Sequence, residues 1–368
     1  MCHLIYTDTF YMKRKWIRWV SWILLTPIIL FVILMVLLYV PPVQNLLRRE
    51  VTAYASKATG MQIQVERIDL RFPLNLLVRG VEVIQQPDTL LSLESLNVRV
   101  QAWPLIKGKV EVDEVTLSRV AVNSADLMEG MKIKGVLGRF FLQSHGVDLS
   151  NELAVINQVE LSDTHVQLLM NDTTTTPKDT TASAPINWKV ALHQLKLKNV
   201  SFSMQLPADS MRMAAHIGEA AIDDAQADLK NQYYDLKKFL LSGTSASYDT
   251  GTAQPAEGFD ASHIAVRDIR IALDSLLYKG RDMNAVIREF TMNERSGLSV
   301  TSLTGRAYSN DSVICVPGLK LNTPHSEIDL SAHTYWELVN IPTTGRLSAR
   351  LNAYIGKEDV MLLSLIHI

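Results

Sequence analysis

The sequence has little of the chemistry that marks enzymes, disulfide-stabilised domains or nucleic-acid-binding proteins. Only two cysteines occur in 368 residues, Cys2 near the start and Cys315 inside an apolar run, so we do not expect a disulfide. The formal net charge is -2, and the basic pair Lys237-Lys238 is too short to form a basic patch. Composition therefore gives no reason to expect a nucleic-acid partner.

Motifs for catalysis and metal binding are also missing from the sequence. The segment LIKGKV contains a Gly-Lys pair but lacks the upstream glycine and the following Ser or Thr of a phosphate-binding loop. No Gly-x-Ser-x-Gly, His-Glu-x-x-His or Cys-x-x-Cys motif is present, and the nine histidines are scattered. Asp223-Asp224 is interpreted as solvated loop surface. We predict no enzyme activity, no catalytic residues, no metal and no cofactor.

One long stretch lacks charge entirely, since no charged residue falls between Arg18 and Arg48. An apolar helix of about 20 residues spans a bilayer, so residues 12–43 are predicted to be a transmembrane anchor. The basic cluster KRKWIR precedes the run, which predicts a cytoplasmic N-terminus and an exported body. A cleaved signal peptide is the competing interpretation, but its apolar region would be shorter and would end in small residues. Residues 1–11 resemble the start of neither and are interpreted as a possible mis-assigned extension.

Long helical patterns are almost absent after the anchor. Residues 44–60 carry apolar side chains at helical spacing between Pro41-Pro42 and Gly60, which predicts a short amphipathic helix. Such a helix either lies on the lipid surface or caps the end of a sheet, and we favour capping. The segment 233–241 (YYDLKKFLL) is the one later candidate helix.

Nearly all remaining segments after Gly60 have the sequence pattern of a β-strand. Apolar and polar residues alternate with turn residues between the segments, as is typical of strands. The clearest alternating segments are 63–65, 93–100, 110–122, 190–197 and 264–271. Two polar, low-complexity stretches, near 171–185 and 242–258, are predicted to be disordered loops.

The alternation slips by one residue at a recurrent place. Within each repeat, apolar residues stand 0, 2, 5 and 7 positions after the first one. The residue just before position 5 (the fifth offset) is usually a type that tolerates turns or bulges. Side chains alternate between faces, so offsets 5 and 7 would point to the other face unless a β-bulge adds one residue. The slip therefore predicts bulged strands with one apolar face. The residues before the fifth offset are Gly80, Arg119, Asp163, Asn199 and Asp268.

The pattern leaves two architectures open, an ordinary β-sandwich with a closed core and an open curved sheet with one apolar face. The residues predicted to share the apolar face are Leu76, Val78, Val81, Val83, Val115, Leu117, Val120, Val122, Val159, Leu161, Val166, Leu195, Leu197, Val200, Phe202, Ile264, Val266, Ile269 and Ile271.

The order of these elements resembles the N-terminal part of the AsmA/TamB family. The resemblance lies in the anchor, the helix ending in Ala58-Thr59-Gly60, and the segments MQIQVERIDLRFPLNLLVRGVEV and WPLIKGKVEVDEVTLSRVAV. It implies a mainly β fold, in which a long, curved, gutter-like antiparallel sheet (a β-taco) is anchored in the inner membrane of a diderm bacterium. It also implies that the apolar residues form a groove for phospholipid acyl chains between inner and outer membranes.

The resemblance further implies a TamA-like outer-membrane barrel as a possible partner, engaged by a C-terminal region that this chain lacks. The ending MLLSLIHI is interpreted as a truncated or artefactual end. Two alternatives remain open, a scaffold or chaperone for outer-membrane proteins that acts by β-augmentation, and an anchored structural β-sandwich. The expected divisions are 1–11 (extension), 12–43 (anchor), 44–60 (helix), 61–360 (gutter) and 361–368 (terminal segment).

Overall fold

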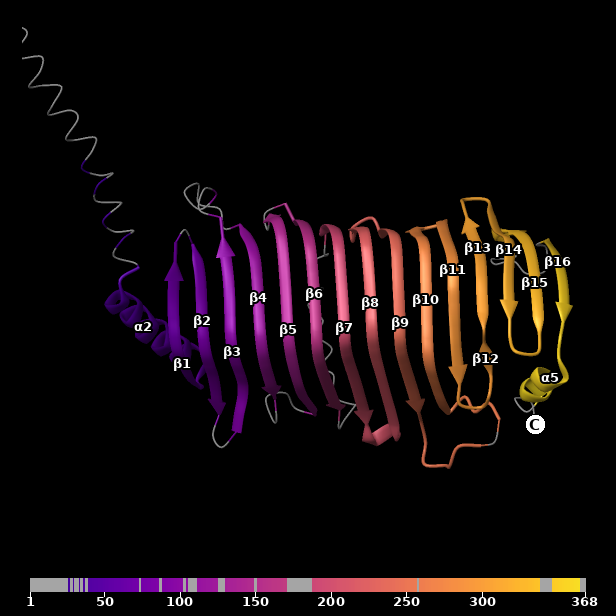
Figure 1. Ribbon diagram of the computed structural model, residues 1–368, viewed down its shortest axis with the longest axis horizontal. Helices are drawn as coiled ribbons and strands as arrows, with labels where there is room; N and C mark the ends of the chain where they lie inside the picture. Colours follow the sequence, from indigo (N-terminus) through magenta and orange to yellow (C-terminus); the bar gives the residue numbers. More distant parts are fainter. Residues whose placement is uncertain are drawn as a thin grey trace, which may run out of the picture.

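The protein forms one large sheet, in which each strand lies beside the next strand of the chain (Figure 1). The sheet has sixteen strands, and β12 pairs only with β11, off the main path. The computed structural model describes residues 26, 29, 33, 36, 39–72, 74–85, 88–101, 104, 111–124, 130–148, 151–170, 187–256, 258–337 and 346–364.

The strands lengthen from the N-terminal edge of the sheet toward its middle. They are β1 (Gln62–Arg71), β2 (Asn75–Gln85), β3 (Asp88–Val100), β4 (Val112–Asn123), β5 (Met131–Asp148), β6 (Leu153–Met170), β7 (Lys189–Leu206), β8 (Met211–Asp228), β9 (Tyr233–Asp249), β10 (His263–Lys279), β11 (Asp282–Glu294), β12 (Ser299–Val300), β13 (Ser302–Ser309), β14 (Val313–Asn322), β15 (Glu327–Tyr335) and β16 (Leu347–Tyr354). A short 3-10 helix, η1 (Pro207–Asp209), joins β7 to β8.

The sheet is open and curved, and among the described residues no second layer packs on it. Its substantial contacts run between neighbouring strands and between α2 and β1. No described large side chain is less than 2 % exposed, so a closed sandwich core is absent from this part of the chain. The expectation of a mainly β, open curved sheet is confirmed, and the alternative of a β-sandwich is wrong.

One detail of the expected fold is corrected by the strand directions. All neighbouring strands pair antiparallel except β6 and β7, which pair parallel from Leu153↔Lys189 to Leu169↔Gln205. The predicted loop 171–185 connects these two strands and lies outside the described residues. Hydrophobic alternation has the same period in parallel and antiparallel strands, so the sequence pattern alone does not distinguish the two.

The helix expected at 44–60 is α2 (Pro41–Thr59), and it covers the free edge of β1. Gly60 ends it in the left-handed conformation with φ 70. The side chain of Gln44 donates to the carbonyl of Leu70 at 2.9 Å, and Arg48 donates to the carbonyls of Val65 and Glu66 at 3.2 and 3.0 Å. Polar side chains of α2 thus satisfy backbone groups that an edge strand would otherwise leave unpaired.

The predicted anchor at 12–43 lies almost wholly outside the described residues, as does the extension at 1–11. Among the residues that the structure does describe, no helix is both long and apolar enough to span a membrane.

Three local predictions in the middle of the chain are wrong. The candidate helix at 233–241 is the first half of strand β9, and the predicted disorder at 242–258 begins inside the same strand, which runs to Asp249. Apolar residues at intervals of two and three along β9 imitate the three-and-four spacing of a helix. Asp223-Asp224 lies within strand β8 and not in a loop.

The connection that follows β9 is held by a single carboxylate. Asp260 accepts hydrogen bonds from the backbone amides of Ala256 and Ser262 at 3.0 and 2.9 Å, and its Oδ2 lies 2.9 Å from Nδ1 of His263. These contacts, the amide of Ala256 first, lower the pKa of Asp260 from 3.8 to about 2. Hydrogen bonds to the charged form explain the order of this segment despite its polar composition.

We expect the Asp260 contacts to persist to an unusually low pH. The folded pKa lies below the unfolded one, so the contribution to stability is complete above about pH 4 and is lost as the pH falls toward about 2. Hydrogen exchange at the amide of Ser262 should report this loss, with a midpoint near pH 2. In Asp260→Asn the protection of this amide, relative to its intrinsic exchange rate, should be low at every pH and show no midpoint near 2. A midpoint near 4 in the unmodified chain would contradict the assignment.

The last described element, α5 (Lys357–Ser364), is fixed to the turn between β14 and β15. The buried carboxylate of Asp359 accepts hydrogen bonds from the hydroxyls of Thr323 and Ser326. These hydrogen bonds lower the pKa of Asp359 against the opposing effect of burial, which is the largest single influence. The terminal segment set apart at 361–368 therefore begins inside this helix.

Candidate functional site: apolar rows across the sheet

Strand pairing brings the predicted apolar residues together in four rows that run across the strands. Residues directly opposite each other in neighbouring strands point to the same face of a sheet. The first row is Leu70, Leu76, Val98, Val115, Leu142, Val159, Leu195, Ile222, Phe239 and Leu273. The second is Ile68, Val78, Leu96, Leu117, Phe140, Leu161, Leu197, Ala220, Leu241 and Ile271.

The third and fourth rows lie beyond the slip in the pattern. The third is Val65, Val81, Leu93, Val120, Leu137, Thr164, Val200 and Ile217. The fourth is Ile63, Val83, Leu91, Val122, Gly135, Val166, Phe202, Ala215, Ala246 and Val266.

Every predicted residue of β2, β4, β6 and β7 falls in one of these rows. In β10, Val266 and Ile271 join the fourth and second rows, and Ile269 pairs with Thr244, which the register of β8 and β9 places opposite Ile217 of the third row. Only Ile264, which pairs with Tyr248, lies beyond the fourth row.

Most row residues are half-buried, and four of them, Ile68, Leu93, Thr164 and Ala220, are buried. The predicted residues of all five strands are half-buried, apart from Phe202, which is 41 % exposed. Side chains of neighbouring strands cover each other laterally, and no described layer covers them from above. The rows therefore present an apolar surface on which further apolar groups would lose contact with water.

Sequence reasoning predicted strands at 63–65 and 93–100 but did not assign their residues to the apolar face, although the signal was present. Leu91, Leu93, Leu96 and Val98 of β3 stand at offsets 0, 2, 5 and 7, as do Ile63, Val65, Ile68 and Leu70 of β1. Shorter residues in β5 and β8, such as Gly135 and Ala220, obscured the same spacing there.

The slip corresponds to a line of interrupted pairing that we call the first kink line. Between β2 and β3, for example, pairing stops after Arg79↔Ser95 and resumes at Val81↔Leu93 with no change of register. Its members are Glu66, Gly80, Glu94, Arg119, Gly138, Asp163, Asn199, Gly218, Gly243 and Asp268.

Residues before the fifth offset adopt the left-handed conformation that the prediction requires. The φ values are 57 for Gly80, 45 for Arg119, 51 for Asp163, 53 for Asn199 and 56 for Asp268. Non-glycine residues rarely adopt this conformation, and Asn and Asp tolerate it best. The prediction that bulge-tolerant residues occupy the slip is confirmed, although the interruption is shared by neighbouring strands and is not one extra residue opposite an intact partner.

Side-chain contacts along the first kink line link neighbouring strands. Asn199 donates to the carboxylate of Asp163 at 2.8 Å, and Arg119 forms an ion pair with Glu94. These side chains are exposed, so each pair contributes little to stability by itself. The Asn199–Asp163 pair joins two left-handed residues, whereas in the Arg119–Glu94 pair only Arg119 is left-handed.

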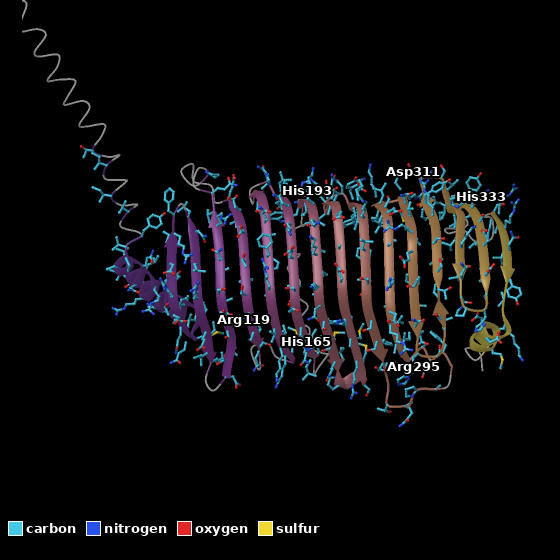
Figure 2. All side chains as sticks on the ribbon, viewed as in Figure 1. Arg119, His165, His193, Arg295, Asp311 and His333 are labelled. Carbon is cyan, nitrogen blue, oxygen red and sulfur yellow. The ribbon has the colours of Figure 1, made fainter. Side chains whose placement is uncertain are left out.

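A second kink line, which the sequence did not reveal, crosses the longer strands β6 to β9. It contains Asn157, His193, Asp224 and Lys237, each of which lies where pairing stops and resumes in register. Asp224 has φ 53, and its carboxylate lies 3.1 Å from Nδ1 of His193. In Figure 2 the labels of Arg119 and His193 mark the two lines at different heights of the sheet.

The two kink lines have a mechanical consequence for the strands that carry them. At each kink, two apolar residues of a strand stand three positions apart, and two residues lie between them in place of the usual one. The extra residue lengthens the face of the strand that carries the polar side chains. The strand therefore bends toward the face that carries the apolar rows. We infer that the apolar rows line the concave face of the sheet.

No cluster of His, Cys, Asp or Glu that could hold a metal occurs among the described residues. A scan against models of known protein families and a search of curated proteins found no match to this chain. The function must therefore be inferred from the geometry of the sheet.

Proposed function

We propose that the protein is a conduit for phospholipids, with the acyl chains lying on the apolar rows and the head groups in water. The observation that supports the proposal is the alignment of apolar residues from β1 to β10 without a covering layer. Ten strands about 4.8 Å apart make these rows about 43 Å long. An apolar surface of that length fits an elongated apolar ligand better than a small compact one.

The energetics of lipid movement explain why such a surface is useful. Exposure of an acyl chain to water costs about 0.8 kcal/mol per methylene, or about 12 kcal/mol for about fifteen methylenes. A row of Val, Leu, Ile and Phe side chains removes most of this cost at each step. Because successive strands present similar side chains, the lipid has no single position at which it is bound tightly.

The location of the conduit is part of the same proposal. The sequence resemblance to the AsmA/TamB family supports anchoring through residues 12–43 in the inner membrane, with the sheet in the periplasm. The conduit would then carry phospholipids toward the outer membrane. Lipid gradients or partners would set the direction of movement.

Photo-crosslinking tests the position of the lipid on the sheet. Benzoylphenylalanine at Leu197, in the second row, is expected to crosslink to phospholipid, which mass spectrometry of the purified chain would detect. The same probe at Lys196, the preceding residue on the other face, is the matched control and should give at least tenfold less adduct. Equal crosslinking at both positions would contradict a one-faced lipid path.

A second candidate function, a scaffold for outer-membrane protein assembly, is favoured by the edge of the sheet. β16 pairs only with β15 within the described chain, and all its residues are exposed. An open edge strand can pair with an incoming strand by β-augmentation, and a TamA-like barrel is the partner that the family resemblance suggests. Loss of barrel assembly with intact lipid crosslinking would favour this candidate.

A further inference from the structure

A hollow of about 420 Å³ lies over β8, β9 and β10. Its floor contains Ala214, Ser247 and Ala265, which lie directly opposite one another in the three strands and so share a face. The neighbouring residues Ala215, Ala246 and Val266 belong to the fourth row and also line the hollow. The hollow therefore adjoins the end of the fourth row.

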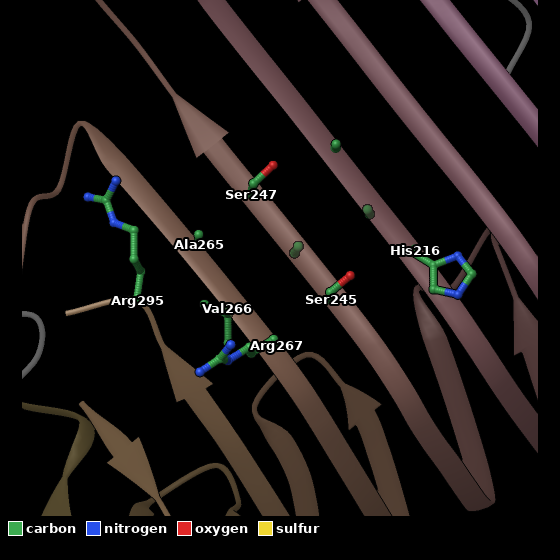
Figure 3. A pocket seen from close by; sticks show the side chains of 10 residues that line it. His216, Ser245, Ser247, Ala265, Val266, Arg267 and Arg295 are labelled. Atoms are coloured by element: carbon green, nitrogen blue, oxygen red, sulfur yellow. The ribbon is translucent and has the colours of Figure 1, made fainter. Parts of the chain in front are cut away.

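Three basic side chains surround this floor. His216 lines the hollow from β8, Arg267 lines it from β10, and Arg295 follows β11, where its amide donates to the carbonyl of Ala265 at 2.9 Å. Figure 3 shows His216 on one side of the hollow and the two arginines on the other, with Ser245 and Ser247 between them. We call this group the arginine hollow.

The arginines of the hollow are exposed, and their side chains have no partner among the residues that the structure describes. Neither guanidinium forms a hydrogen bond or an ion pair with any residue in the described part of the chain. The adjacent carboxylate of Asp268 instead accepts a hydrogen bond from Asn293 at 3.2 Å. The ring of His216 is oriented by a 3.0 Å contact between Nδ1 and the hydroxyl of Ser201, which leaves Nε2 available.

We propose that the arginine hollow binds a phosphate group, with Arg267 and Arg295 as charged donors and His216 as a third donor. A guanidinium offers five N–H groups in a planar fork that matches phosphate and carboxylate. Two forks and an imidazole offer more donors than the two oxygens of one carboxylate accept, whereas the additional oxygens of a phosphate use them. The small side chains of the floor leave the space that the group occupies.

The test measures binding of two probes to the full chain in a non-ionic detergent by isothermal titration calorimetry. The probes are inorganic phosphate and dihexanoyl phosphatidic acid below its micelle concentration. Saturable binding of inorganic phosphate would identify a free phosphate compound as the source, and binding of phosphatidic acid alone would identify a lipid head group. Either result supports the hollow, and failure of both probes to bind would overturn the proposal.

Variants assign the binding to the hollow. Arg267→Gln and Arg295→Gln are each expected to raise the Kd at least tenfold, and Ala265→Leu is expected to do the same by filling the floor without a change of charge. Arg270→Gln, an exposed arginine of the same strand outside the hollow, should change the Kd less than twofold. Equal effects of Arg267→Gln and Arg270→Gln, or unchanged affinity in Ala265→Leu, would overturn the proposal in favour of general charge attraction.

Discussion

Replacement of Leu117 and Val120 by aspartate is expected to remove nearly all phospholipid that co-purifies with the protein. These residues lie in the second and third apolar rows, on either side of Arg119 in the first kink line. Leu117 is flanked by Leu96 and Phe140 in the neighbouring strands. Two carboxylates at the middle of the rows would interrupt the apolar surface across its width.

The size of the effect follows from the methylenes that would lose apolar contact. If each lipid chain withdraws about four methylenes from the charged positions, the loss is about 3 kcal/mol, or more than 100-fold in local affinity. Phospholipid per mole of protein, quantified by mass spectrometry after purification, provides the measurement. An unchanged lipid content in the double variant would contradict the proposed path.

Thr116→Asp with Ser118→Asp is the matched control for this experiment. Both residues belong to the same strand and alternate with the apolar ones, so they point to the opposite face. Retention of lipid in this control, together with its loss in the row variant, would separate a one-faced surface from a general effect of charge. Similar circular dichroism spectra of both variants would show that the sheet is intact.

Much of the sheet could be predicted from spacing alone. Offsets 0, 2, 5 and 7 in β2, β4 and β7 placed Val78, Val120 and Phe202 in rows that strand pairing then aligned. The residue before the fifth offset was informative because only a few residue types tolerate a positive φ within a strand. The need for a positive φ restricts which residue types occupy this position, and recurrence of the position in several strands makes the restriction recognisable in the sequence.

Other features could not be predicted because they depend on partners that are distant in the sequence. The second kink line passes through Asn157, His193 and Lys237, and only its interrupted pairing identifies these residues as equivalent. The arginine hollow brings together residues of β8 and β10 and Arg295 after β11, across a register that shifts twice. No single segment carries a pattern for either feature.

Alanine at Gly138 or Gly218 is expected to destabilise the sheet more than most surface substitutions. Both glycines lie in the first kink line. A Cβ on Gly138 would lie 2.7 Å from Cβ of Asp163 and 2.9 Å from its carbonyl oxygen, and one on Gly218 would lie 2.8 Å from the carbonyl oxygen of Gly243. Backbone atoms in mid-sheet cannot move aside without breaking ladder hydrogen bonds. We expect each variant to lose about 1–3 kcal/mol in free energy of unfolding.

Gly318→Ala is the control, because a Cβ there would meet nothing within 4 Å. At such a position alanine restricts the unfolded chain and is expected to be neutral or to stabilise by up to about 1 kcal/mol. The denaturant midpoint should therefore fall in Gly138→Ala and Gly218→Ala and should stay the same or rise in Gly318→Ala. Destabilisation of Gly318→Ala equal to that of Gly138→Ala would show that flexible glycine is needed throughout the sheet. A selective loss at Gly138 and Gly218 would show that close packing of neighbouring strands sets the kink line, and with it the curvature toward the apolar rows.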